Sequence, residues 1–157
     1  MSNFLLYNLN DYSLFEDILL NELKFKNLVI LCIGTKNYEN DDFGVKIGDE
    51  LKNVKIISLG HSKREINGLN YSKVYDFIKQ KLPKYKVVIL DSVYINSDSK
   101  PYLVFKKSGV NVSGINSDKV IGDYGILYNS FSYSSKNIKD FVINLLTKTF
   151  NKLCQNN

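Results

Sequence analysis

Two aspartates that follow apolar runs are the residues of this chain best suited to chemistry. Asp41 lies in the loop after a run at residues 28–33, which Gly34 stops, and Asp91 directly follows a second run at residues 87–90. Uninterrupted apolar runs of this kind are typical of strands buried on both faces in a parallel sheet. Because ligands bind such sheets beyond the carboxyl ends of neighbouring strands, we expect both carboxylates to lie in one crevice.

Two carboxylates that share a crevice have three chemical interpretations. Because they cannot both ionise at low cost, one pKa should rise, and the pair could share a proton for acid and base work on a water that attacks an amide. The same oxygens could instead hold a divalent cation, an alternative that we do not favour, so we predict no metal and no cofactor. In the third interpretation the roles are structural: Asp41 or Asp42 caps the following helix, and Asp91 bonds loop amides.

Other polar residues surround the same predicted crevice. His61, the single histidine, follows the second predicted strand at the same edge, although a lone histidine in a loop is also compatible with no role. The chain has no Gly-x-Ser-x-Gly elbow and no Gly-Lys-Ser/Thr loop, which argues against a serine triad and against nucleotide binding. Cys32 should be an inert core thiol. The candidate substrate-binding residues are Gly34, Thr35, Asp42, His61 and Ser92.

The elements that position these residues alternate between helices and strands. Hydrophobic periodicity predicts helices at residues 12–24, 43–51, 70–82 and 135–150, with capping signals at Ser13 and Ser135, and strands at residues 28–33, 54–59, 87–90, 102–105 and 124–128. The connection at residues 108–116 is rich in Gly, Ser and Asn and is predicted to be a loop. Gly44 and Gly48, one turn apart, should let the second helix lie close on the sheet.

This order of elements predicts a single α/β domain over residues 1–157. Right-handed crossovers favour an open, doubly wound and mostly parallel sheet in which the first and third strands are neighbours, in the order 2-1-3. No helical pattern separates the last two strands from what precedes them, so we expect one antiparallel edge strand.

Composition excludes several classes of partner. The formal charge of +5 comes from lysines spread along the chain, with Arg64 as the single arginine, and no stretch resembles a nucleic-acid groove. No apolar run approaches 18 residues and no signal peptide is evident, so we expect no membrane association and a cytoplasmic protein. Cys32 and Cys154 lie too far apart in the predicted fold for a bridge, which favours a reducing compartment. The oligomeric state is not predicted.

Several motifs resemble a known family. Cys32-Ile-Gly-Thr35, followed by Asp41-x-Phe-Gly44, resembles the opening motif of the YyaC-type sporulation proteins, which belong with the germination (spore) proteases and the hydrogenase maturation proteases. The segment at residues 88–91 resembles the second aspartate-bearing strand of that family, and residues 121–129 resemble its late Gly-Asp strand.

This resemblance implies an α/β/α sandwich in three layers, with Asp41 and Asp91 as the catalytic pair. The implied activity is that of a sporulation-associated, aspartate-dependent endopeptidase that acts on a protein or peptide substrate. Hydrogenase maturation proteases use the residue matched by Asp41 as a nickel ligand with a second acid after strand two, where this chain offers Ser58, Gly60 and His61, so that triad is incomplete here. The alternative is a non-catalytic peptide-binding or regulatory module on the same scaffold.

Overall fold

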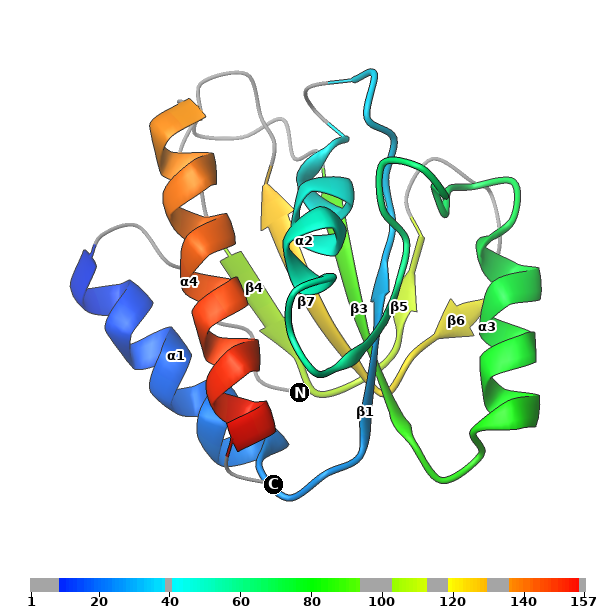
Figure 1. Ribbon diagram of the computed structural model, residues 1–157, viewed down its shortest axis with the longest axis horizontal. Helices are drawn as coiled ribbons and strands as arrows, with labels where there is room; N and C mark the ends of the chain where they lie inside the picture. The colour runs from blue at the N-terminus through cyan, green and yellow to red at the C-terminus, as the bar shows by residue number, and fades with distance from the viewer. Residues whose placement is uncertain (1–8, 39–40, 94–102, 113–118, 130–135, 156–157) are drawn as a thin grey trace.

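The structure, a computed structural model, describes residues 9–38, 41–93, 103–112, 119–129 and 136–155. Figure 1 shows a central sheet with helices on both sides. The elements are α1 (Leu9–Leu23), β1 (Leu28–Cys32), α2 (Phe43–Leu51), β2 (Ile57–Leu59), α3 (Tyr71–Lys81), β3 (Lys86–Val93), β4 (Leu103–Lys106), β5 (Val110–Asn111), β6 (Val120–Ile121), β7 (Tyr124–Asn129) and α4 (Lys136–Gln155).

Five strands form the main sheet in the order β2-β1-β3-β7-β4. The first four of these strands run parallel, and β4 pairs antiparallel with β7 at the edge. This arrangement confirms the predicted 2-1-3 order and the predicted antiparallel edge strand. The carboxyl ends of β1 and β3 therefore meet at one edge of the sheet, at the top in Figure 1.

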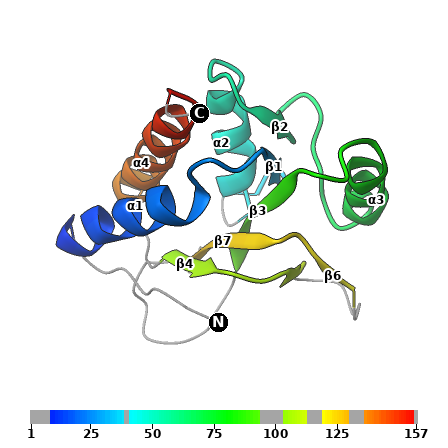
Figure 2. The same ribbon diagram turned by 90° about the horizontal axis from the view of Figure 1, so that it is seen from below.

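The sheet and the helices on its two faces form the three layers of an α/β/α sandwich. One apolar cluster fills the space on each face of the sheet. Side chains alternate along a strand, so Ile30 and Cys32 of β1 face α1, α2 and α4, whereas Val29 and Leu31 face α3 and the β5–β6 hairpin. Figure 2 shows the two helical layers from below, with α3 on its own side of the sheet. The apolar runs of β1 and β3 are continuous because both faces of these strands are buried.

Helix α2 lies against the end of β1 at very short range, as the glycine spacing predicted. A Cβ atom at Gly44 would lie 2.3 Å from the carbonyl oxygen of Ile33, and one at Gly48 would lie 1.8 Å from the carbonyl oxygen of Gly60. Residues without a Cβ are therefore required at both positions. This close packing fixes the start of α2, and with it Asp41 and Asp42, beside the carboxyl end of β1.

The prediction for the second strand is wrong in its first half. It was expected at residues 54–59, but β2 begins only at Ile57. The N–H of Val54 donates to the carbonyl of Leu51 (3.1 Å), and the N–H of Ile56 donates to the carbonyl of Val54 (2.8 Å). These tight turns at the end of α2 keep residues 54–56 out of the sheet.

Other elements also differ from the prediction. Helix α1 begins at Leu9, so Ser13 lies within the helix rather than at its cap. The predicted loop at residues 108–116 contains β5, which pairs with β6 in a separate two-stranded sheet. The third strand was expected to stop at residue 90 but continues to Val93, because β7 still offers a partner there. The predicted cap residue Ser135 lies outside the described residues.

Candidate active site

Asp91 lies inside β3, at the point where β1 leaves the sheet. β1 ends with Cys32 opposite Leu90, and the N–H of Ile33 makes a last bond to the carbonyl of Leu90 (2.8 Å). One residue further, Asp91 pairs with Leu127 of β7, while the pairing of β3 with β1 has already ended at Leu90. Its side chain is nevertheless only 2% exposed, so the carboxyl group is held inside the protein.

The carboxyl group of Asp91 is only partly satisfied by hydrogen bonds. Oδ1 accepts the N–H of Ser92 (2.8 Å), while Oδ2 is buried without a hydrogen-bond partner among the described residues. Burial raises the pKa of Asp91 well above its ordinary value, the negative charge of Asp41 raises it further, and the Ser92 N–H opposes this. Asp91 therefore keeps its proton at a pH at which an ordinary aspartate has lost it.

Asp41 closes the loop that follows β1. Its carbonyl oxygen accepts the N–H of Thr35 (2.9 Å), its Oδ2 accepts the Thr35 hydroxyl (3.0 Å), and its own N–H donates to Tyr38 (2.8 Å). Burial raises the pKa of this half-buried carboxyl group, hydrogen bonds from Thr35 lower it, and the charges of Asp42 and Glu65 raise it. The charge of Asp41 is also the second cause of the raised pKa of Asp91, after burial.

Gly34 allows the loop to fold back over the end of the strand. A Cβ atom at this position would lie 2.3 Å from the carbonyl oxygen of Asp41, so a side chain would push the Asp41 backbone away. The N–H of Gly34 donates to the carbonyl of Ile66 (2.8 Å), which ties the loop after β2 to the loop after β1. Gly34 and Thr35 thus shape the backbone that presents Asp41.

Asp42 has a different role from its neighbour. It occupies the N-cap position of α2, as predicted for Asp41 or Asp42, but its side chain does not make the predicted capping bond. Its Oδ1 lies 2.8 Å from Nζ of Lys139 on α4, and its Oδ2 lies 3.4 Å from Nζ of Lys46. Asp42 is only 6% exposed. Its carboxylate therefore ties α2 to α4, which makes it less suited to contact a substrate.

His61 and Ser92 belong to different elements, the loop after β2 and the strand β3. Nδ1 of His61 accepts the N–H of Lys63 (3.2 Å), and the main chain of His61 forms a short bridge with Arg64 in the loop after β2. Ser92 is buried, and strand alternation places its side chain with Leu90 on the face of α2 and α4, opposite to Asp91. Both residues remain candidates for substrate binding.

Glu65 is a site residue that the sequence prediction missed. Its carboxylate accepts the N–H of Lys36, and its charge contributes to the raised pKa of Asp41. The loop after β2 turns back towards β1, which places a second acid beside the Asp41 loop. Even so, within the described ranges no three His, Cys, Asp or Glu side chains are grouped as a metal site.

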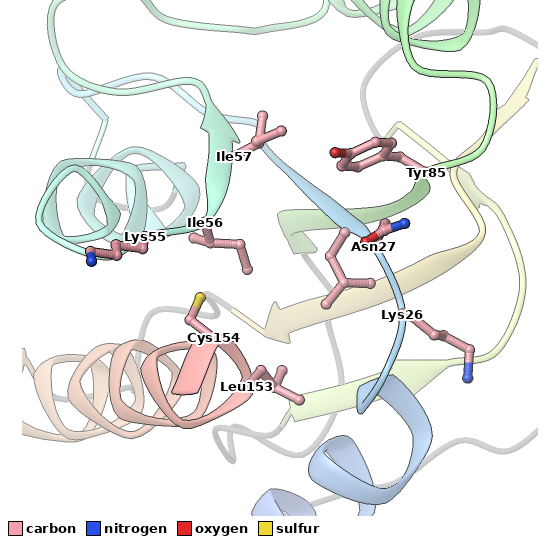
Figure 3. Close-up of a pocket in the computed structure, with 9 residues that line it drawn as sticks. Lys26, Asn27, Lys55, Ile56, Ile57, Tyr85, Leu153 and Cys154 are labelled. Atoms are coloured by element: carbon pink, nitrogen blue, oxygen red, sulfur yellow. The ribbon is translucent and has the colours of Figure 1, made fainter. Parts of the chain in front are cut away.

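A separate pocket of about 370 Å³ lies at the opposite end of the parallel strands. Figure 3 shows Cys154 and the start of β2 around it, with the amino groups of Lys26 and Lys55 pointing away from its centre. It is lined by Lys26, Asn27, Leu28, Lys55, Ile56, Ile57, Tyr85, Leu153 and Cys154. Its lining comes from the starts of the strands and the residues before them, together with the end of α4, and it includes neither Asp41 nor Asp91.

None of the helices in the described part of the chain is both long and apolar enough to cross a membrane. Comparison with curated proteins gave no match. The fold is similar to the crystal structure of a NiFe hydrogenase maturation protease, HycI, from Thermococcus kodakarensis KOD1. The match has a TM-score of 0.50 and 17% sequence identity, and it covers 88% of this chain and 99% of that one.

At this identity, the likeness to HycI demonstrates a shared α/β fold. The family comparison covers nearly the whole sequence, because a single family model matches residues 4–151. The chain therefore belongs to the family described as protein of unknown function, DUF1256.

Proposed function

We propose that this protein is an aspartate-dependent endopeptidase in which Asp41 and Asp91 act as a pair on a protein substrate. The observation that carries the proposal is the state of Asp91: a carboxyl group 2% exposed, with one unpartnered oxygen and a pKa raised by burial and by Asp41. Carboxyl pairs that share one proton perform acid and base catalysis in proteases. The fold that the chain shares with a maturation protease is compatible with this chemistry.

The two carboxyl groups differ in a way that assigns their roles. Asp41 is half-buried and closer to solvent, so it serves as the ionised base that takes a proton from a water molecule. The water oxygen then bonds to the scissile carbonyl carbon, while protonated Asp91 gives its proton to the carbonyl oxygen. When the C–N bond breaks, the leaving nitrogen takes the proton from Asp41 and the new carboxyl group returns one to Asp91.

The cellular setting is part of the same proposal. The ordered motifs that resemble YyaC-type proteins support a sporulation-associated role in the cytoplasm, on a protein substrate. This role predicts that the protein accumulates in sporulating cells and is absent during vegetative growth. Immunoblotting of the source organism through both phases would check it, and equal amounts in both would contradict it.

Cleavage of a proteome-derived peptide library, with new termini identified by mass spectrometry, tests the activity directly. We expect wild type to cleave, and Asp41→Asn or Asp91→Asn to lower the rate by roughly 100- to 10,000-fold, the usual contribution of a positioned acid or base. Asp17→Asn, the same change at an exposed position on α1, is the matched control and should cleave like wild type. Equal cleavage by wild type and both site variants would refute the assignment.

A non-catalytic peptide-binding module is the second candidate, and the burial of Asp91 is the observation that favours it. A side chain that is 2% exposed offers little surface to a substrate in the absence of movement. This candidate predicts that peptides bind without cleavage and that Asp91→Asn leaves their affinity unchanged. Binding together with turnover by wild type would exclude it.

A further inference from the structure

A second pocket, of about 480 Å³, lies beside β2 and reaches towards the candidate active site. Its lining comes from β2, from the loop that follows and from the start of α3, and it is made by Ser58, Leu59, Gly60, His61, Arg64, Glu65, Ile66, Asn70 and Val74. Its residues are separate from those of the pocket in Figure 3.

One wall of this pocket is an edge of the main sheet. β2 is the last strand in the sheet order, and β1 is its single strand partner among the described residues. Ser58 and Leu59 of β2 line the pocket, so this part of the wall is the main chain of an edge strand, and the chain then turns at Gly60 and His61. An exposed strand edge presents N–H and C=O groups that can pair with an added extended peptide.

The remaining lining consists of an apolar floor, the basic side chain of Arg64 at the rim, and the polar residues Glu65 and Asn70. Leu59, Ile66 and Val74 provide aliphatic surface from three different segments. Arg64 is exposed at the rim, and in the described part of the chain it forms no ion pair. A guanidinium group in this position matches a carboxylate with paired hydrogen bonds. Because Nδ1 of His61 accepts a bond from Lys63, the Nε2–H is left to donate.

Two residues of the lining are linked to the loop that holds Asp41. Glu65 lines the pocket, accepts the N–H of Lys36 and contributes to the raised pKa of Asp41. Ile66 also lines it, and its carbonyl accepts the N–H of Gly34 in the loop that holds Asp41. A chain lying along β2 would therefore lead towards Asp41.

We propose that this groove binds the substrate as an extended peptide that carries an aliphatic residue within two positions of a carboxylate. The peptide main chain pairs with the edge of β2, the aliphatic side chain fills the floor of Leu59, Ile66 and Val74, and the carboxylate pairs with Arg64. This inference deepens the proposed peptidase function and rests on it for the fate of the bound chain. Binding itself needs neither Asp41 nor Asp91.

The test is a positional-scanning library of fluorescein-labelled octapeptides, measured by fluorescence anisotropy on wild type and on Asp91→Asn. We expect selection of an aliphatic residue and an acidic residue within two positions of each other. Arg64→Gln should weaken binding of the selected peptides about tenfold, as expected for loss of one charge-assisted contact. It should have no effect on peptides in which Gln replaces the acidic residue. Lys63→Gln, an exposed neighbour that is outside the lining, is the matched control and should bind like wild type.

The outcomes separate this inference from the proposed function. Selective, Arg64-dependent binding without cleavage by wild type would support the groove and refute the peptidase. Cleavage without any preference for aliphatic and acidic residues, or with equal affinity in Arg64→Gln, would overturn the groove and leave the peptidase. Val74→Lys, which places a charge on the floor, should abolish the aliphatic preference, and unchanged selection by this variant would also overturn the proposal.

Discussion

Replacing Lys139 with methionine should destabilise the protein strongly, because it removes the buried partner of Asp42. The Lys139 amino group and the Asp42 carboxylate lie 2.8 Å apart, with side chains 5% and 9% exposed. Methionine keeps most of the length and apolar volume of the lysine stem. The change therefore removes the charge while preserving most of the packing of α4.

The expected loss follows from this burial. Breaking a buried ion pair by removing one partner typically costs roughly 3–5 kcal/mol, because the other charge stays inside the protein. For a domain of this size, such a loss lowers the melting temperature by roughly 6 to 20 °C. Lys46 is the matched control: it contacts the same carboxylate at 3.4 Å, but its side chain is 39% exposed. Lys46→Met should cost at most about 1 kcal/mol.

Urea unfolding followed by circular dichroism would measure both variants and complete a double-mutant cycle. We expect Asp42→Asn and Lys139→Met together to cost clearly less than the sum of the two single changes, because the pair is removed as a unit. Equal costs for Lys139→Met and Lys46→Met, or strict additivity in the cycle, would refute the interpretation that the buried pair ties α2 to α4.

Two further predictions concern the same edge of the sheet. The folded-state pKa of Asp91 is raised, so the stability that protonated Asp91 contributes is complete below the ordinary aspartate pKa of about 3.9 and is lost as the pH rises through the folded-state pKa. Asp91→Asn should therefore gain stability relative to wild type as the pH rises, by at most about 1.4 kcal/mol per pH unit. Urea unfolding from pH 4 to 8 would measure this difference. A pH-independent difference would contradict this. Gly48→Ala should lose about 2 kcal/mol in the same assay, because the new Cβ meets the carbonyl oxygen of Gly60 at 1.8 Å, whereas a gain in stability would show that α2 can move away.

Most of the main sheet could be predicted from the sequence, because strands buried on both faces have continuous runs of apolar residues. The continuous apolar runs that became β1 and β3 identified the two central strands, and the order of helices and strands then fixed the 2-1-3 arrangement. Short elements were harder. β5 and β6 have two residues each, too few for a period, and the late start of β2 depends on local turns at Val54 and Ile56.

Only those features of the candidate site that follow from the order and direction of the strands could be predicted. Strand ends indicated that Asp41 and Asp91 would meet, since parallel neighbours end at the same edge. The roles of other side chains depend on contacts that no local pattern encodes: Lys139 lies 97 residues from Asp42, and Glu65 reaches the Asp41 loop because the segment after β2 turns back. Asp41 and Asp42 are adjacent in sequence, yet Asp41 bonds Thr35 in the loop after β1, whereas Asp42 pairs with Lys139 on α4.

The coupling between Asp41 and Asp91 is tested most directly by titrating the side-chain carboxyl carbon of Asp91 by NMR, in wild type and in Asp41→Asn. We expect the pKa of Asp91 to lie well above the ordinary range in wild type. It should fall in Asp41→Asn, while staying raised because burial is the larger cause. An ordinary pKa in wild type, or the same pKa in both proteins, would contradict the account of a coupled carboxyl pair.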